Sequence, residues 1–301
     1  MSDSFPAVSL AASPGKAKIV VDAAVQLEAS GFSGIYCPSF GDALGLSLSI
    51  AHATSTIEIG TSIQPIYFQH PAALATTARY LHEVSDGRFR LGLGVSHAPV
   101  VDRLGVSTGK PLSDMRTYVA EMQAAAEGSG GLGPITLATL RDKMVTLSVE
   151  VADGAVWANG SRNRMQHSLG LIPQARRDEG FFVGNMIPTV IDDDIDAARA
   201  KNRRTLSGYV RLPNYRNYWA ETYPEEMAAI GTAVDAGDNA AVAVAMTDRW
   251  LDDVTLSGSA GRVRDEVQAW FDTGVSTPIL VPGSTTGGQA KAIGELIACF
   301  A

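Results

Sequence analysis

The chain alternates between short runs rich in β-branched and aromatic residues and longer stretches whose apolar residues recur at helical spacing. In the first unit, strands are expected over 5–10 and 34–37, with a helix over 16–30 between them. Such alternation is typical of a parallel sheet with helices packed outside it. Further strands are expected over 57–63, 88–94, 134–140, 155–158, 181–190 and 277–281, and further helices over 43–54, 71–84, 114–127, 143–151, 165–177, 192–207 and 290–300.

The eight expected strands favour a (β/α)8 barrel over a doubly wound sheet, because a C-terminal helix closes the chain after the eighth strand. We therefore predict a single domain over 1–301, with a helical excursion at about 208–272. An aromatic group in the excursion is expected to pack its helices, with covering of a planar ligand as the alternative. The group consists of Tyr215, Tyr218, Trp219 and Tyr223.

The composition is that of an ordinary globular protein, with 46% hydrophobic and 19% charged residues. A net charge of −8 argues against a general nucleic-acid surface, which needs a dense cationic face. No apolar run approaches the roughly 18 residues of a membrane helix. Cys37 and Cys299 lie far apart and suggest no disulfide framework, and the start MSDSFPAVSL lacks the features of a signal peptide. We therefore expect a cytoplasmic protein without nucleic-acid or membrane partners.

Several segments together resemble the luciferase-like monooxygenase superfamily. The segment HPAALA at 70–75 and the segment SDGRFRLGLG at 85–94 carry the closest resemblance. TIEIGTSI at 56–63 is similar to the third strand of that family, and VADGA at 151–155 to its approach to the sixth strand. The resemblance covers most of the chain and implies a luciferase-like (β/α)8 barrel, which agrees with the fold predicted from the alternation.

A finer resemblance concerns the residues after the fourth strand. GVSHAPVV at 94–101, followed by MRTY at 115–118, is most similar to an actinobacterial branch that depends on coenzyme F420. The resemblance implies a deazaflavin or flavin ring over the strand ends, which moves a hydride or activates oxygen. We expect F420 as the cofactor, with FMN as the alternative, and a small organic molecule as the substrate.

A homodimer is also expected, because members of the family are often dimers. The helix expected over 43–54 supports this expectation with a run of large apolar residues, Leu44, Leu46, Leu48 and Ile50.

The chain departs from the family pattern in two places. Many deazaflavin relatives carry an Asp-His pair after the second strand, where this chain has Ser39 and Phe40. A long insertion before the fifth strand is replaced by the glycine-rich connection 128–133. These departures keep a third interpretation open, a flavin-binding protein that has lost its chemistry.

Candidate cofactor contacts follow the third and fourth strands, since ligands of such barrels meet the loops at the carboxyl ends of the strands. The resemblance implies that Ser62 and Ile63 form a bulge with a cis peptide against the ring; the alternative is a plain strand end. Gly94 would let the backbone approach a flat ring, with Val95 and Ser96 at its rim.

His97 is the candidate catalytic residue. It is the one histidine placed directly after a strand, and the dinucleotide-binding fingerprint would need glycine at this position. An imidazole with a pKa near its reference value of about 6.5 can donate a proton to a substrate as a hydride arrives. The alternative is a capping or supporting histidine. The other histidines fall on expected helices or their starts and indicate no metal site.

Polar residues after three other strands complete the candidate site. Ser39 follows the second strand, and Thr139 follows the fifth. After the sixth strand, Asn159, Gly160, Ser161 and Arg162 offer amide donors and a guanidinium near a helix start. Because helix N-termini and arginine bind phosphate well, this segment is expected to contact the tail of the cofactor.

Overall fold

The computed structural model describes residues 5–128 and 130–301. Its strands and helices follow the chain order and the parallel pairing of a (β/α)8 barrel, which confirms the predicted fold class. The chain forms two compact units. Unit 1 comprises Met1–Trp157 and Leu171–Gly184, and unit 2 comprises Ala158–Gly170 and Asn185–Ala301. The single domain over 1–301 stays a prediction.

Unit 1 contains parallel strands in the order β1-β2-β3-β5-β6-β7, with β4 beside β5. Ile35 on the second strand pairs with Val8 on the first and Ile59 on the third. All three side chains are fully buried, as expected for a parallel sheet covered by helices. The bounds are β1 (Ala7–Ser9), β2 (Gly34–Cys37), β3 (Glu58–Thr61), β4 (Gln64–Pro65), β5 (Phe89–Gly94), β6 (Ile135–Ala138) and β7 (Gly154–Ala158).

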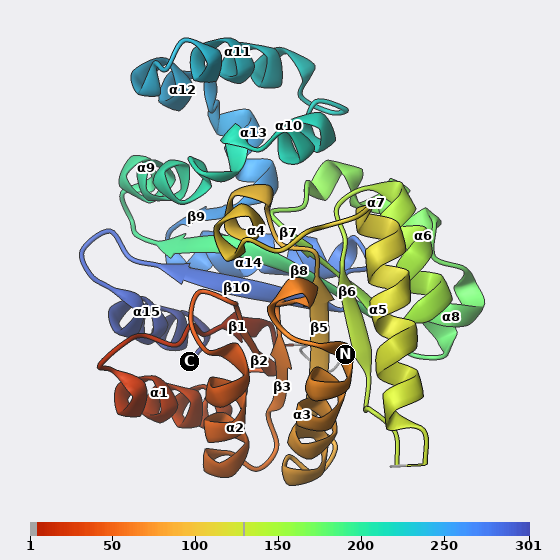
Figure 1. Ribbon diagram of the computed structural model, residues 1–301. Helices are drawn as coiled ribbons and strands as arrows, with labels where there is room; N and C mark the ends of the chain where they lie inside the picture. The colour runs from red at the N-terminus through yellow and green to blue at the C-terminus, as the bar shows by residue number, and fades with distance from the viewer. Residues whose placement is uncertain (1–4, 129) are drawn as a thin grey trace. The chain divides into compact units, whose positions relative to one another are not determined.

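The helices of unit 1 follow the predicted apolar periodicity. In α1, Val20, Ala24 and Leu27 are buried, and α3 begins at Pro71, which suits the first helical turn. Neighbouring helices α1, α2, α3, α5 and α6 contact one another in chain order (Figure 1). The bounds are α1 (Ala17–Ala29), α2 (Ala43–Ala53), η1 (Ile66–Phe68), α3 (Pro71–Val84), α4 (Ala98–Leu104), α5 (Pro111–Ala126), α6 (Asp142–Val151) and α8 (Gln174–Asp178).

Unit 2 holds most of β8, together with β9 and β10, and the helices of the excursion. Thr189 on β8 pairs in parallel with Leu256 on β9, and β8 also pairs with β10. The predicted helix over 165–177 is divided, since α7 ends at Gly170 and Pro173 disfavours a continuous helix. The bounds are β8 (Phe182–Ile191), β9 (Leu256–Gly258), β10 (Thr277–Gly283), α7 (Arg162–Gly170), α9 (Ile195–Leu206), η2 (Tyr209–Arg211), α10 (Pro213–Trp219), α11 (Pro224–Asp235), α12 (Asn239–Ala245), α13 (Asp248–Val254), α14 (Ala260–Asp272) and α15 (Gln289–Phe300).

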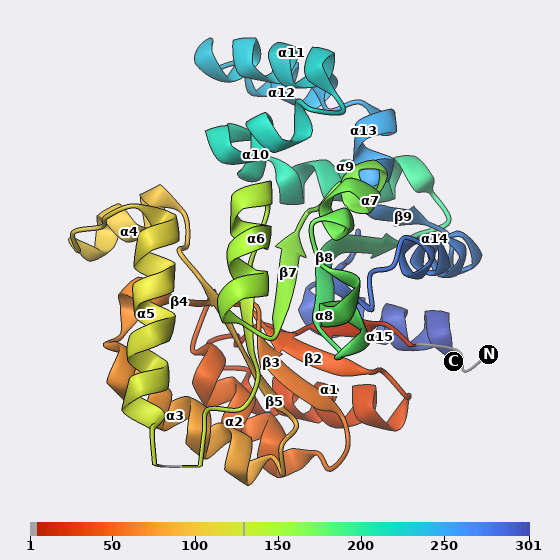
Figure 2. The same cartoon turned by 90° about the vertical axis from the view of Figure 1, so that its right-hand side faces the viewer.

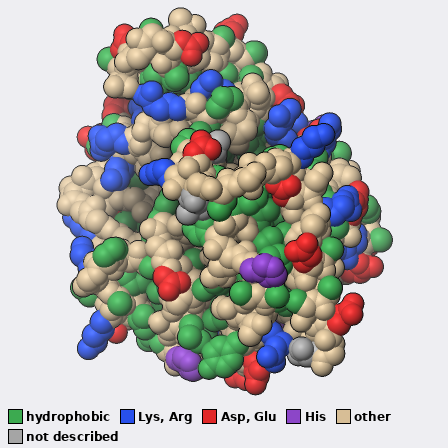
Figure 3. Space-filling view, in the orientation of Figure 1, with side chains coloured by type: hydrophobic (Ala, Val, Ile, Leu, Met, Phe, Trp, Pro, Cys, Tyr) green, Lys and Arg blue, Asp and Glu red, His purple; other side chains and the backbone are tan. Residues whose placement is uncertain are grey.

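Three features of the structure bear on possible partners. In the described part of the chain, no helix combines the length and apolar character that a membrane crossing requires. On the face drawn in Figure 3, acidic side chains are interspersed among the basic ones. Of the apolar residues that suggested a dimer face, Leu44, Leu46 and Ile50 are buried against the protein's own core. The homodimer therefore rests on the family resemblance.

Candidate functional site

The turn after β3 carries Ser62 and Ile63, which are joined by a cis peptide bond. The Ser62 amide donates to the carbonyl of Cys37 on β2 at 2.9 Å. The Thr61 hydroxyl donates to the carbonyl of Gly92 on β5 at 2.8 Å and accepts from the Gly92 amide at 3.0 Å. These bonds hold the end of β3 between its two neighbours. The cis peptide implied by the resemblance is confirmed, and contact of this pair with a ring stays a prediction.

Gly94 lies at the carboxyl end of β5, directly beside the Ile63 side chain. A β-carbon on Gly94 would stand 2.5 Å from Cδ1 of Ile63 and 3.1 Å from the β-carbon of Ala138 on β6. These distances are shorter than van der Waals contact, so glycine here makes room for Ile63. The packing of Ile63 is thus a reason for the glycine in addition to the expected approach to a flat ring. Contact between Gly94 and the cofactor stays a prediction.

Val95, Ser96 and His97 continue from β5 into α4, and all three are half-buried. Ser96 has a φ of +62°, a left-handed conformation that turns the chain at the strand end. His97 is the N-cap residue of α4, and its carbonyl accepts from the amides of Val100 and Val101. Burial lowers the pKa of His97 from its ordinary value.

Ser39 and Thr139 lie after β2 and β6, at the same edge of the sheet. Ser39 is half-buried in a turn, and the next residue, Phe40, is 79% exposed. Thr139 is buried, and its amide donates to the carbonyl of Val156 at 2.8 Å. Its hydroxyl has no hydrogen-bond partner among the described residues. Because β2, β3, β5 and β6 are successive neighbours, unit 1 brings the predicted residues of these strand ends to one edge.

The candidate residues after β7 belong to unit 2 and begin with Asn159 and Gly160. Asn159 has a φ of +57°, and its carbonyl accepts from the indole of Trp219 at 3.1 Å. The Gly160 amide donates to Oδ1 of Asn185 on β8 at 3.1 Å. The Nδ2 atoms of Asn159 and Asn185 are both buried without a hydrogen-bond partner in the described chain.

Ser161 and Arg162 make intramolecular contacts at the start of α7. The Ser161 amide donates to the hydroxyl of Tyr218 at 3.1 Å, and its own hydroxyl donates to Asp253. Arg162 forms an ion pair with Glu266. A role for these two residues at a cofactor phosphate stays a prediction, and it requires these bonds to be exchanged for bonds to the phosphate.

Asp253 on α13 is a functional candidate that sequence reasoning missed. Its carboxylate accepts from the Ser161 hydroxyl and, at 2.9 Å, from the Asn163 amide. Burial raises its pKa, while these hydrogen bonds act to lower it. No local signal could have found it, since it lies 92 residues from Ser161.

The aromatic group of the excursion packs inside unit 2, as expected. Its four members are at most 5% exposed. The ring of Trp219 lies 5.2 Å from that of Tyr215 and 5.0 Å from that of Trp250. Among the described residues, no group of His, Cys, Asp and Glu side chains is arranged to hold a metal ion.

Comparison with known proteins identifies the class of this chain. The model of the luciferase-like monooxygenase family matches residues 4–277, so the chain belongs to that family.

Curated relatives refine the comparison. A 5,10-methylenetetrahydromethanopterin reductase of Archaeoglobus fulgidus is 25% identical over 278 residues, covering 82% of this chain and 83% of the relative. A putative coenzyme F420-dependent oxidoreductase of Mycobacterium tuberculosis is 26% identical over 282 residues, covering 77% of this chain and 81% of the relative. The chain is therefore similar to enzymes of the oxidoreductase class.

Solved structures confirm the barrel fold. The coenzyme F420-dependent tetrahydromethanopterin reductase of Methanopyrus kandleri superposes with a TM-score of 0.77 at 17% identity, covering 97% of each chain. The FMN-bound oxygenating constituent of 3,6-diketocamphane monooxygenase from Pseudomonas putida superposes with a TM-score of 0.63 at 17% identity, covering 98% of this chain and 96% of the other. At 17% sequence identity, this structural similarity shows a shared fold and nothing further.

Proposed function

We propose that this protein is an F420-dependent oxidoreductase that transfers a hydride between the deazaflavin and a small organic substrate. The observation that carries the proposal is the arrangement at the end of β5. There the Ser62–Ile63 turn packs on Gly94, and an ionisable His97 follows at the start of α4. The names of the curated and structural relatives favour F420 over FMN.

The residues of unit 1 fit a flat ring with polar edges. Ile63 offers an apolar surface, and the Thr139 hydroxyl is a buried donor and acceptor without a partner in the described chain. Ser39, Ser62, Ile63, Gly94, Val95, Ser96 and Thr139 are the residues that would hold the ring. When bound, F420 supplies a ring carbon that gives or accepts a hydride.

His97 is the residue that we assign to proton transfer. Because burial lowers its pKa, the imidazole is mainly neutral at pH 7. A neutral imidazole can accept the proton of a substrate hydroxyl during oxidation, and its protonated form donates a proton during reduction. The lowered pKa therefore keeps the imidazole in the form that acts as a base at neutral pH.

The cofactor tail is assigned to the residues after β7. Asn159 is well suited among them, because its Nδ2 is a buried donor without a partner in the described residues. Gly160, Ser161 and Arg162 would contribute once their bonds to Asn185, Tyr218, Asp253 and Glu266 are exchanged.

Titration with F420 and with FMN tests the cofactor. We expect saturable quenching of F420 fluorescence, and hydride transfer that proceeds under nitrogen. Saturable binding of FMN without binding of F420, together with substrate-dependent oxygen consumption, would establish the monooxygenase alternative. A third outcome is tight F420 binding in which no carbonyl or alcohol substrate oxidises or reduces the bound cofactor. This outcome would favour a flavin-binding protein without chemistry, the interpretation that the exposed Phe40 motivates.

We also propose that the protein acts in the cytoplasm as a homodimer, as the family resemblance implies. Light scattering at micromolar concentration should give twice the mass of the 31.6 kDa chain. A monomer at that concentration would contradict the proposal.

A further inference from the structure

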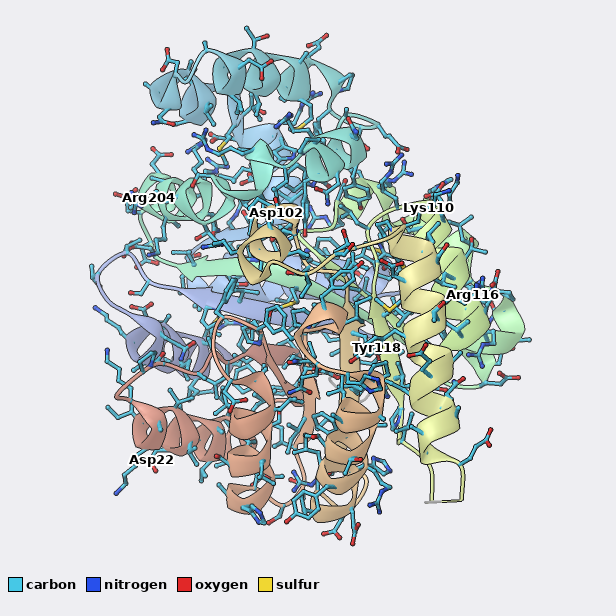
Figure 4. All side chains as sticks on the ribbon, in the orientation of Figure 1. Asp22, Asp102, Lys110, Arg116, Tyr118 and Arg204 are labelled. Carbon is cyan, nitrogen blue, oxygen red and sulfur yellow. The ribbon has the colours of Figure 1, made fainter. Side chains whose placement is uncertain are left out.

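The connection from β5 to α5 is a strap that spans 95–110 and carries His97 near its beginning. The strap contains the short helix α4, which ends at Gly105 in the left-handed conformation with a φ of +65°. Figure 2 shows the strap leading from α4 to the N-terminal end of α5, and Figure 4 marks Asp102 on α4 and Lys110 at the beginning of α5. The strap continues directly from β5 at its near end, and at its far end a side chain of α5 hydrogen-bonds to it.

Asp114, in the first turn of α5, holds the far end. Its Oδ2 atom accepts a hydrogen bond from the hydroxyl of Tyr67 at 2.7 Å and another from the amide of Gly109 at 2.8 Å. Tyr67 lies on η1, the turn that follows β4, and Gly109 lies on the strap. One carboxylate oxygen thus joins η1, the segment after the Ser62–Ile63 turn, to the strap that carries His97.

Both partners of Asp114, Gly109 and Tyr67, have properties that favour these hydrogen bonds. A β-carbon on Gly109 would stand 2.5 Å from Oδ1 of Asp114, so a side chain there would displace the carboxylate from the Gly109 amide. Burial, followed by the hydrogen bond and charge of Asp114, raises the pKa of Tyr67. The Tyr67 hydroxyl therefore stays protonated and remains a donor at any pH at which the enzyme would work.

A second contact holds η1 without Asp114. The hydroxyl of Tyr118, one turn further along α5, donates to the carbonyl of Gln69 at 2.9 Å. At the far end of the strap, by contrast, Asp114 supplies the side-chain hydrogen bond from α5 that reaches the Gly109 amide. Loss of the Asp114 carboxylate should therefore release the strap while η1 keeps its place.

We propose that Asp114 is a positioning residue, which fixes the strap and thereby sets the place of His97 relative to the Ser62–Ile63 turn. The effect on the reaction rests on the proposed function, because it acts through His97. A displacement of about 1 Å at a reacting group can cost on the order of 100-fold in rate. The effect on the strap itself needs no cofactor or substrate and can be measured separately.

Amide hydrogen exchange on the protein without cofactor tests the strap. In Asp114→Ala, the amide of Gly109 and those of α4 should exchange about tenfold faster or more, and those of α2 should be unchanged. Asp102→Ala is the matched control, because it removes an exposed carboxylate from the strap itself. Unchanged exchange of the Gly109 amide in Asp114→Ala would overturn the proposal. If that variant does not fold, Asp114→Asn keeps the side-chain shape. It should also speed up exchange of the Gly109 and α4 amides, but by a smaller factor.

A titration of the His97 ring by NMR tests the link to the site. Release of the strap should expose His97 and raise its pKa toward the ordinary value, whereas loss of a negative charge alone would lower it. A rise in Asp114→Ala and none in Asp102→Ala supports the proposal, and a fall in both contradicts it.

Turnover then separates the two proposals. Asp114→Ala should lower kcat at least tenfold, and in a His97→Ala background it should lower kcat no further, because both changes remove the same function. Full additivity of the two losses would overturn the action through His97. Asp114→Ala could change the amide exchange of the strap and the pKa of His97 although the wild-type protein shows no turnover with F420. In that case the proposed function fails while the positioning role stands.

Discussion

The carbonyl oxygen of Thr61 stands 1.9 Å from the point that a β-carbon on Gly92 would occupy. The two residues are also joined by the hydrogen bonds of the Thr61 hydroxyl, so β3 and β5 approach closely where the Ser62–Ile63 turn begins. The clash would involve backbone, which cannot rotate away as a side chain can. Glycine at position 92 is therefore a condition for the shape of this strand end.

Gly92→Ala should destabilise the protein by about 1–3 kcal/mol or more, as expected for overpacking of a rigid core. Gly231→Ala on α11 is the matched control, because a β-carbon at position 231 would meet no atom within 4 Å beyond its own helix backbone and chain neighbours. Alanine there should be neutral or stabilise by about 0.5–1 kcal/mol. Urea unfolding of both variants measures the difference, and equal stabilities would contradict the packing argument.

The barrel could be predicted from the sequence because its longer strands and helices alternate regularly and carry apolar residues at regular spacing. The eight expected strands all appear, whereas β4 and β9 were missed. Two- and three-residue strands show no period along the chain, and their pairing depends on neighbours remote in sequence. Helix α4 was missed for a related reason, since seven residues starting with Ala98 and Pro99 form barely two turns.

Local sequence predicted where His97 lies, directly after a strand, and its role stays a prediction. The Ser62–Ile63 cis peptide was implied by the family resemblance. The partners of Ser161 and Arg162 were not predicted, because Asp253 and Glu266 are 92 and 104 residues away from them. The packing reason for Gly94 was also missed, since it depends on the side chain of Ile63 in the turn after another strand.

Glu28 should make the stability of unit 1 depend on pH. Its Oε1 accepts from the amides of Ser55, Thr56 and Ile57 and from the Thr56 hydroxyl. Burial acts to raise the pKa of Glu28, but these bonds outweigh it and lower the pKa below its ordinary value of 4.5. A carboxyl with a lowered pKa stabilises the fold above its unfolded pKa, and this contribution is lost as pH falls through the folded pKa.

Glu28→Gln should therefore cost about 1–3 kcal/mol at pH 7, and less at a pH below the folded pKa, where wild-type Glu28 is itself protonated. Unfolding by urea at pH 7 and at a series of lower pH values measures this difference. Glu127→Gln, at an exposed position, is the control and should change little at any of these pH values. A cost that stays the same down to the acid unfolding of the protein would contradict the role of the ionised carboxylate.

The pair of Arg162 and Glu266 allows a test of the cofactor-tail assignment. If Arg162 binds a phosphate of F420, Arg162→Ala should weaken F420 binding at least tenfold, the equivalent of one charge-assisted hydrogen bond. Glu266→Gln removes the competing carboxylate and should leave the affinity unchanged or increase it. Fluorescence titration gives both dissociation constants. Equal weakening by the two variants would show that the ion pair supports the fold, without a direct contact to the cofactor.

His97→Ala should lower turnover by about 10²–10⁴-fold, the usual range for loss of a general acid or base. Cofactor affinity should change much less, because the tail contacts are assigned to other residues. His52→Ala is the control, since His52 is an exposed histidine on α2. A variant at position 97 with normal turnover on an established substrate would exclude the proton-transfer role.

The pH dependence of the same reaction separates proton transfer from a supporting role for His97. Since burial lowers the pKa of His97, oxidation of substrate should hold its rate down to a pH below 6.5 and then fall as the imidazole becomes protonated. Reduction should show the opposite pH dependence, with a rate that rises as pH falls through the same pKa. In His97→Ala both pH dependences should disappear from kcat/KM, because the group that titrates is gone. If they persist in the variant, another residue carries the proton, and His97 serves only as the N-cap residue of α4.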